Sequence, residues 1–185
     1  AGKMDFNFKE TNIHSVIDYV KSTLSEVAKS KNLSLVTEET ENLPLINADS
    51  QRLEQVLTNL VSNAIKFTPE GKRITIKSKL INSKDISINE NFKDIVKKLE
   101  GDYIMVSVID EGIGMEEKDL LHAFDKFAQI ENSLSRKAGG TGLGLPIAKQ
   151  LLDAHQGAIW CDSEPEKGSQ FYFVVPIAKT AIQLA

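Results

Sequence analysis

The interpretation of this chain depends most on the stretch GGTGLGLPIAK, residues 139–149. Four of its first six residues are glycine, and an apolar sequence typical of a helix follows. Glycine lets the backbone approach a ligand closely, and a helix N-terminus presents unpaired N–H groups with partial positive charge. The stretch is therefore typical of a phosphate-binding loop, although a flexible loop has the same composition. No Gly-Lys-Ser/Thr ends it and no predicted strand precedes it, which excludes a Walker loop and a dinucleotide fingerprint.

Length and composition favour one well-buried domain, because 185 residues with 41% hydrophobic content suffice for a single core. The formal charge of −4 argues against a nucleic-acid-binding surface. A single cysteine, Cys161, excludes an internal disulfide and a multi-cysteine zinc site, and we expect it to pack as a small apolar residue on a strand. No apolar run approaches the ~20 residues that cross a bilayer, and no signal peptide opens the chain. We expect a cytoplasmic segment without membrane contact, cut from a longer polypeptide.

Apolar periodicity predicts three long helices, at residues 11–31, 50–66 and from the glycines to about 155. Asp49 is the expected N-cap of the second helix. Alternating patterns predict five strands, at residues 33–36, 73–81, 103–109, 158–162 and 170–175. This order favours an α/β (α+β) fold, a two-layer sandwich of a mixed five-stranded sheet with three main helices on one face. The other face is expected to be partly solvated or covered by a partner.

Two short helices are also expected, at about residues 92–99 and 117–123. The first belongs to a polar stretch, residues 82–102, that we interpret as an insertion between two strands.

The helix at residues 50–66 carries two neighbouring stripes. The apolar one is expected to face the core and consists of Leu53, Leu57, Leu60 and Ala64. The polar one places Asn59, Asn63 and Lys66 at i, i+4 and i+7, so two amides and an ammonium share one edge. Amide oxygens suit Mg²⁺ that also binds phosphates, although an ordinary solvated helix face shows the same pattern.

A carboxylate ends the predicted strand at residues 103–109, where Asp110 is followed by Gly112, Gly114 and Met115. A buried acceptor at this point can read a donor such as an exocyclic amine, and glycines let the chain lie against a flat ring. A strand followed by an ordinary turn is the alternative.

Three weaker features complete the candidates. Phe124 and Phe127 are expected mainly to anchor a loop in the core. Arg136 lies just before the glycines, where a cation can reach a phosphate. Ser169 follows a glycine at the start of the last predicted strand, where a hydroxyl can approach a ligand or simply form a turn.

Together and in this order, the motifs resemble those of the catalytic ATP-binding domain of sensor histidine kinases. That domain belongs to the GHKL superfamily, shared with gyrase, the Hsp90 chaperones and the MutL mismatch-repair proteins, and has the Bergerat ATP-binding fold. The resemblance covers almost all of residues 11–176. Its motifs are an N box at 59–68, a first glycine box at 110–115, an F box at 124–127, a second glycine box at 140–144 and a closing element at 168–171.

The resemblance implies Mg²⁺ ligands at Asn63 and Asn59, and phosphate contacts from Lys66 and Arg136; these four would be the catalytic residues. It implies that Asp110 accepts a hydrogen bond from the adenine amine. Further nucleotide contacts are implied for Phe67, which flanks the ligand, Gly114, close to the base, and Ser169, through water. Backbone N–H groups of the second glycine box would wrap the phosphates, from Gly140, Gly142, Leu143 and Gly144. The remaining implied ATP contacts are Gly112, Met115, Phe127, Ile130 and Thr141.

The implied organisation is a catalytic domain at residues 11–178 that includes an ATP lid at 129–140. Residues 1–10 would be a linker or the exit of an upstream helical dimerisation domain, and 179–185 a tail or linker. None of His14, His122 and His155 has the context of a phosphoacceptor. The resemblance therefore implies transfer of the γ-phosphoryl group of Mg-ATP to a histidine on a separate dimerisation domain, with a response regulator receiver domain as the next partner.

Three alternatives remain open at this point. A gyrase-type or chaperone-type clamp would hydrolyse ATP, but its glutamate base is replaced here by Asn59, and Glu54 lies off the polar stripe. A protein-serine kinase of the same superfamily would share the nucleotide site. A degenerate docking module is opposed by the completeness of the motifs.

Overall fold

The computed structural model describes residues 5–125 and 142–178. The helices are α1 (Ile13–Ser30), α2 (Ser50–Phe67), α3 (Lys93–Val96), α4 (Glu117–His122) and α6 (Gly144–Ala154), with 3₁₀ turns η1 (Ser83–Asp85) and η2 (Glu90–Phe92). The strands are β1 (Lys9–Thr11), β2 (Ser34–Glu39), β3 (Ile46–Ala48), β4 (Arg73–Asn82), β5 (Asp102–Asp110), β6 (Ala158–Glu164) and β7 (Gly168–Pro176).

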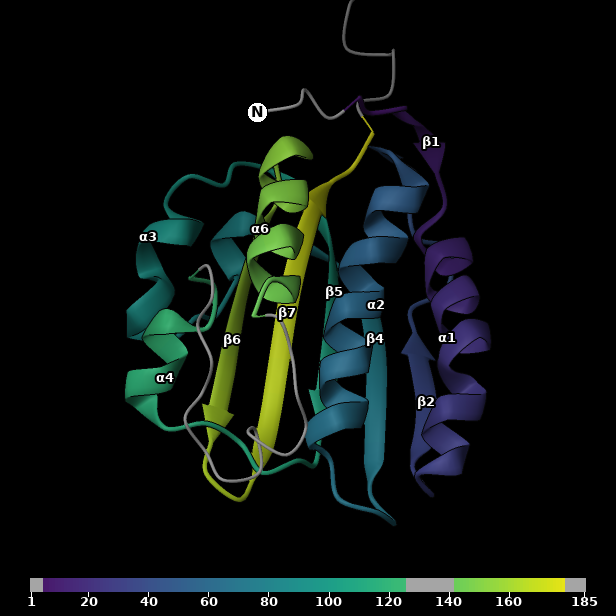
Figure 1. The fold of residues 1–185 in the computed structure, drawn as a ribbon. Helices are drawn as coiled ribbons and strands as arrows, with labels where there is room; N and C mark the ends of the chain where they lie inside the picture. Colours follow the sequence, from purple (N-terminus) through teal and green to yellow (C-terminus); the bar gives the residue numbers. More distant parts are fainter. Residues whose placement is uncertain (1–4, 126–141, 179–185) are drawn as a thin grey trace, which may run out of the picture.

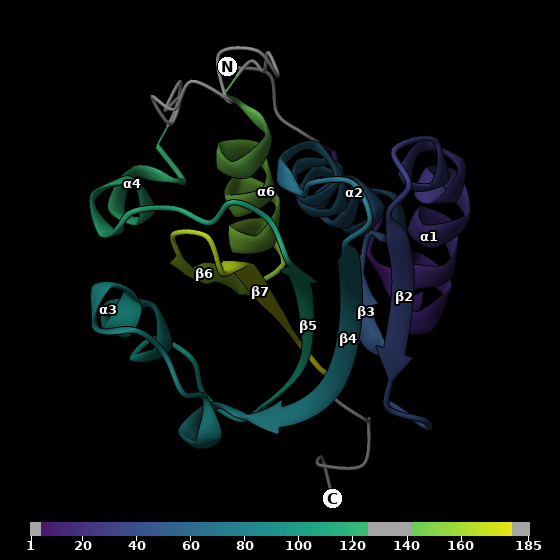
Figure 2. The same ribbon diagram turned by 90° about the horizontal axis from the view of Figure 1, so that it is seen from below.

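The main sheet has the strand order β2-β4-β5-β7-β6. Only β2 and β4 are parallel and the other neighbouring pairs are antiparallel, so the sheet is mixed. The long helices α1, α2 and α6 lie on one face, with α2 between the other two (Figures 1 and 2). This arrangement confirms the two-layer sandwich expected from the sequence.

The helix starts follow local chemistry. Asn12 and Asp49 cap α1 and α2, because their side-chain oxygens accept hydrogen bonds from the backbone N–H groups of His14 (3.0 Å) and Arg52 (3.2 Å). The predicted apolar stripe of α2 is buried in the core, and so is Cys161 on β6. Among the described helices, none combines the length and the apolar character that crossing a membrane needs.

A second, two-stranded sheet was not predicted. In it β1 pairs antiparallel with β3, from Lys9 opposite Ala48 to Thr11 opposite Ile46. Strands of three residues are too short to show alternation in the sequence. Just before β1, the ring of Phe8 lies 4.9 Å from that of His155, which follows α6. The start of the described chain therefore lies against the domain, while the expectation of a linker at residues 1–10 stays a prediction.

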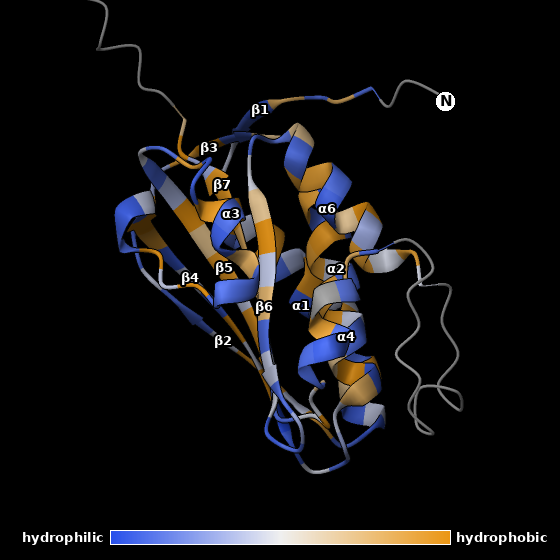
Figure 3. Cartoon of the chain, turned by 90° about the vertical axis from the view of Figure 1, so that its left-hand side faces the viewer, coloured by the Kyte–Doolittle hydropathy of each residue, from blue (hydrophilic) through white to orange (hydrophobic). Residues whose placement is uncertain are grey.

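The opposite face of the main sheet differs from the expectation. Side chains alternate across a strand, and the residues on the face away from the long helices include Met105, Trp160 and Val174, all of them buried. Residues 83–99 lie over this face, with α3 on the far side of β6 and β7 from α6 (Figures 2 and 3). The chain itself therefore covers part of the face that was expected to be solvated or held by a partner. The helix predicted at residues 92–99 is shorter, because α3 ends at Val96.

Candidate functional site

A pocket opens where α2, the end of β5, the start of α6 and the start of β7 meet. Its walls are mainly apolar, with a few polar groups among them. The lining residues are Asn63, Ala64, Phe67, Asp110, Ile113, Gly114, Met115, Leu145, Ser169 and Phe171. Residues up to 106 positions apart in the sequence therefore meet at one site. Six of the lining residues were candidates from the sequence: Asn63, Phe67, Asp110, Gly114, Met115 and Ser169.

Asp110, the last residue of β5, is the buried charge of this pocket, and its side chain is only 6% exposed. Its Oδ1 accepts hydrogen bonds from the backbone N–H groups of Gly112 (2.8 Å) and Ser169 (3.2 Å). Burial raises the pKa of the carboxyl to about 6, against the lowering effect of these two bonds. Within the described residues no hydrogen bond reaches Oδ2. The second oxygen is therefore available to accept from a ligand.

Two glycines set the backbone around this carboxylate. A Cβ on Gly112 would lie 2.5 Å from Oδ1 of Asp110 and 2.9 Å from the carbonyl oxygen of Phe67. Gly114 has a φ of +67°, and a Cβ there would lie 1.9 Å from the carbonyl oxygen of Glu164. Gly114 lines the pocket as expected, but the atoms that crowd it belong to the backbone at Glu164. Gly112 is not part of the lining and acts by holding Asp110.

A serine pair joins the loop after β5 to the turn between β6 and β7. The hydroxyl of Ser163 accepts a hydrogen bond from the backbone N–H of Met115 (2.8 Å) and donates to the carbonyl oxygen of Gly168 (3.0 Å). It also lies 2.9 Å from the hydroxyl of Ser169. Because Ser163 has one proton, the Ser169 hydroxyl donates to it when that proton goes to Gly168. Sequence reasoning missed Ser163, which no motif includes.

The polar edge of α2 is present as predicted, with Asn59, Asn63 and Lys66 all half-buried. Only Asn63 lines the pocket. The side-chain N–H₂ of Asn59 donates to the carbonyl oxygen of Gly144 (3.0 Å), and no hydrogen bond among the described residues reaches its Oδ1. The ammonium of Lys66 lies 4.9 Å from the centre of the Phe67 ring.

The described residues contain no cluster of three or more His, Cys, Asp or Glu side chains suited to a metal ion. A cation at this edge would therefore depend on amide oxygens and on ligand phosphates.

The second glycine box is described in part. Gly142 has a φ of +65°, Leu143 is the residue before α6, and Gly144 is its first residue. None of the three lines the pocket, but within residues 5–125 and 142–178 no side chain caps the start of α6. The predicted contacts at Phe127, Ile130, Arg136, Gly140 and Thr141 lie outside the described residues.

Four lining residues were not predicted, namely Ala64, Ile113, Leu145 and Phe171. In the sequence they are indistinguishable from core residues, because Ala64, Leu145 and Phe171 continue the apolar pattern of a helix or strand and Ile113 is an apolar residue in a loop. The available signals were that Ile113 and Phe171 fall within the motifs at 110–115 and 168–171, and that Ala64 and Leu145 adjoin Asn63 and Gly144.

Residues 48–179 match the family model described as "Histidine kinase-, DNA gyrase B-, and HSP90-like ATPase". This chain belongs to that family. Its curated relatives include the sensor histidine kinase GacS of Pseudomonas protegens, 38% identical over 181 residues that cover 97% of this chain and 18% of the relative. Another is the sensor histidine kinase WalK of Bacillus subtilis, 37% identical over 155 residues that cover 82% of this chain and 22% of the relative. The chain thus spans about a fifth of the length of these relatives.

Solved structures agree with this assignment. The nucleotide-free catalytic domain of the histidine kinase ThkA matches with a TM-score of 0.72 and 28% identity, covering 94% of this chain and 100% of that one. Full-length ShkA in complex with AMPPNP matches with a TM-score of 0.74 and 27% identity, covering 100% of this chain and 34% of that one. The fold is therefore that of a GHKL histidine kinase catalytic domain.

Proposed function

We propose that this domain binds Mg-ATP in the pocket and presents the γ-phosphoryl group to a histidine on a separate helical dimerisation domain. The observation that carries the proposal is the buried carboxylate of Asp110, whose Oδ1 is fixed by two backbone N–H groups while Oδ2 is left for a ligand. A buried acceptor with apolar neighbours is costly unless a donor pairs with it, and the adenine amine is such a donor.

The pocket around Asp110 fits a flat heteroaromatic ring. Ile113, Met115 and Phe171 supply apolar walls that exclude water, and Ser169, whose backbone N–H donates to Asp110, also lines the pocket. Excluding water strengthens the hydrogen bond to Asp110, because the local dielectric constant falls. The AMPPNP complex of ShkA supports ATP as the ligand of this fold.

The residues beside the base pocket fit phosphates and a divalent cation. Asn63 lines the pocket, Oδ1 of Asn59 accepts no hydrogen bond from a described residue, and Lys66 lies on the same helix edge. The start of α6 adds N–H groups that no side chain in the described part of the chain caps. When bound, Mg-ATP supplies the phosphoryl group, while these residues neutralise and orient its charge. No general base is needed in this chain.

The three histidines fit a separate acceptor. His155 is buried, with Nε2 accepting from the backbone N–H of Asp49 (3.1 Å) and Nδ1 lying 2.7 Å from the carbonyl oxygen of Leu151. His14 lies near Glu39, and His122 contacts Asp125. None of them lines the pocket. Glu54 is also absent from the lining, which favours phosphoryl transfer over the clamp-type hydrolysis that uses a glutamate base.

The downstream partner in this proposal is a response regulator receiver domain. A structure of ThkA in complex with the response regulator TrrA matches this chain with a TM-score of 0.67 and 28% identity, covering 92% of this chain and 42% of that one. We place the reaction in the cytoplasm, which supplies ATP.

The test is to mix the domain with Mg²⁺, radiolabelled ATP and a separate helical domain that carries the acceptor histidine. The proposal predicts label on the acceptor that is lost in acid and kept in base, because phosphohistidine has this lability. Replacing the acceptor histidine by alanine should remove the label. Rapid release of inorganic phosphate without labelled acceptor would instead establish a hydrolase.

A further inference from the structure

The covering segment at residues 83–99 is held to the body of the domain by apolar side chains. Phe92 and Leu99 are its two most buried apolar residues, at 7% and 9% exposure. Ile86, Ile88 and Ile95 are partly buried against the same core. A surface loop with this much buried apolar area has a fixed position, so its contacts can affect the neighbouring elements.

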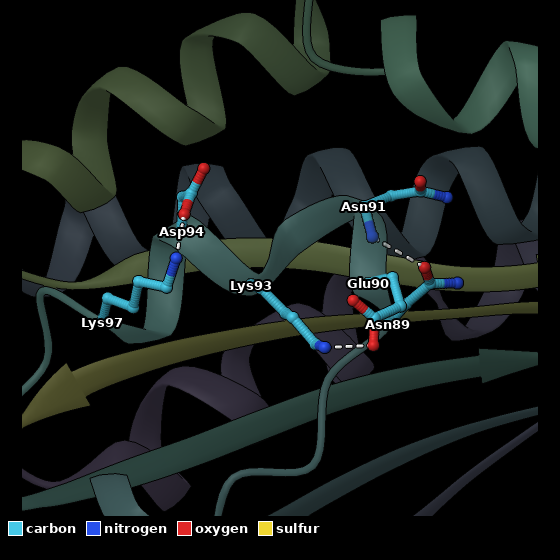
Figure 4. A network of polar contacts seen from close by, with 6 residues as sticks. All are labelled: Asn89, Glu90, Asn91, Lys93, Asp94 and Lys97. Atoms are coloured by element: carbon cyan, nitrogen blue, oxygen red, sulfur yellow. Dashed lines mark hydrogen bonds and ion pairs between the residues drawn. The ribbon is translucent and has the colours of Figure 1, made fainter.

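Local polar contacts shape the turn that carries Phe92 (Figure 4). The side chain of Asn89 accepts a hydrogen bond from the backbone N–H of Asn91 (3.0 Å) and so caps η2. Ion pairs follow between Lys93 and Glu90 and between Lys97 and Asp94. These exposed pairs contribute little stability by themselves, but the cap fixes the direction in which the turn presents Phe92.

The turn contacts α4 in two ways. The side-chain amide of Asn91 donates to Oε1 of Glu117 at 3.4 Å. Beside it, the ring of Phe92 meets the ring of Phe124, just after α4, edge to face, with centres 6.1 Å apart and planes at 81°. Edge-to-face aromatic pairs prefer a definite geometry, so this contact restrains Phe124.

Phe124 in turn meets a wall of the pocket. Its ring lies edge to face with that of Phe171, with centres 6.3 Å apart and planes at 78°. Phe171 lines the same pocket as Asp110 and pairs with Val108 of β5. Three rings from the covering segment, the end of α4 and β7 thus form a continuous row from the far side of the sheet to the pocket.

We infer that Phe92 is a positioning residue for the nucleotide pocket, which acts through Phe124 to hold the ring of Phe171 against the ligand. The inference rests on the proposed function for the identity of the ligand. Phe92 does not line the pocket, so its effect is on the shape of the apolar wall and not on the phosphates. Its loss should weaken binding of the base while Mg²⁺ dependence stays unchanged.

The experiment compares Phe92→Ala with Leu99→Ala, since both truncate a buried apolar residue of the same segment. We expect Phe92→Ala to weaken ATP binding by roughly 5-fold in calorimetry and Leu99→Ala by less than 2-fold, at similar losses of stability, because the ring of Phe92 belongs to the row that reaches Phe171. Phe92→Leu keeps the apolar bulk without the ring. If Phe92→Ala does not fold, Phe92→Leu takes its place in the same comparison. Phe92→Tyr keeps the ring and should restore affinity.

A measurement that needs no ligand tests this inference independently of the proposed function. The methyl resonances of Ile113 and Leu145, both in the pocket wall, should shift in Phe92→Ala and stay in place in Leu99→Ala. Equal effects of the two variants on these resonances and on affinity would overturn the inference and leave the segment with a structural role alone. If the unmodified chain did not bind ATP, the proposed function would fail, and the resonances would still decide whether Phe92 positions the pocket.

Discussion

The side chain of Asn59 on α2 donates a hydrogen bond to the carbonyl oxygen of Gly144, the first residue of α6, at 3.0 Å. Through this bond the polar edge of α2 contacts the start of α6, where we propose that the phosphates bind. A Cβ on Gly144 would lie 3.6 Å from the side chain of Asn59, at ordinary contact distance. Asn59 therefore has a structural contact in addition to its proposed role toward Mg²⁺.

Replacing Asn59 by alanine should lower the free energy of unfolding by about 1 kcal/mol, because the hydrogen bond to Gly144 is lost. Asn63→Ala is the matched control, since Asn63 lies one turn further along the same edge and no described hydrogen bond ties its side chain to α6. Urea denaturation should show the loss only in Asn59→Ala, while both variants lose Mg²⁺-dependent ATP affinity. Equal stability of the two variants would contradict a stabilising role for the hydrogen bond between Asn59 and Gly144.

Stability should depend on pH through Asp110. Burial raises the pKa of this carboxyl in the folded domain to about 6, from an ordinary value of 3.8. Between these values the folded state holds more protons than the unfolded state, so the contribution of Asp110 to stability is greatest at low pH and is lost as pH rises through about 6. The shift corresponds to roughly 3 kcal/mol when complete.

The measurement is urea denaturation of the unmodified chain and of Asp110→Asn at pH 5 and pH 8. The asparagine keeps an oxygen for the N–H groups of Gly112 and Ser169 but carries no charge. We expect the variant to gain stability relative to the unmodified chain, and to gain more at pH 8 than at pH 5. A stability difference that does not change with pH would show that Asp110 keeps an ordinary pKa.

Gly114→Ala should be strongly destabilising, because its φ of +67° is unfavourable for alanine and the new Cβ would lie 1.9 Å from the carbonyl oxygen of Glu164. We expect a loss of about 3 kcal/mol or more. Gly101→Ala is the control, because Gly101 also has a positive φ, +90°, but open space around it. It should cost about 1 kcal/mol. Similar costs in thermal unfolding would mean that backbone conformation alone, and not the contact with Glu164, makes glycine necessary.

Ser163→Ala should cost more stability than Ser169→Ala. The first change removes the partner of the Met115 N–H and of the Gly168 carbonyl oxygen, whereas the second leaves both bonds intact. We expect about 1–3 kcal/mol for Ser163→Ala in denaturant titration, and less for Ser169→Ala. The reverse order would show that Ser163 does not hold the pocket loop in place.

Most of the fold was predictable because its signals are local. The caps at Asn12 and Asp49 and the apolar stripe of α2 define helices within a few residues of sequence. The pairing of β1 with β3 and the position of residues 83–99 depend on contacts between distant segments. Such contacts leave no periodic trace in short polar stretches.

The residues of the candidate site could likewise be predicted only in part. Asp110 and Ser169 were found because polar residues beside glycines stand out in a sequence, and Asn63 because it shares one helix edge with Asn59 and Lys66. Ile113 and Phe171 were missed because an apolar residue that lines a pocket looks the same as one in a core. Ser163 was missed because its role follows from the approach of two loops, near Met115 and Gly168, that lie far apart in the chain.

Calorimetric titration of ATP into Asp110→Asn, in saturating Mg²⁺ at pH 8, tests the central claim most directly. In this variant an N–H₂ group replaces the free oxygen, so two donors face each other where the adenine amine would bind. We expect affinity to fall by about 100-fold or more, while the variant stays folded and at least as stable as the unmodified chain. Affinity within 2-fold of the unmodified chain, in a folded variant, would contradict the assignment of Asp110 as the adenine acceptor.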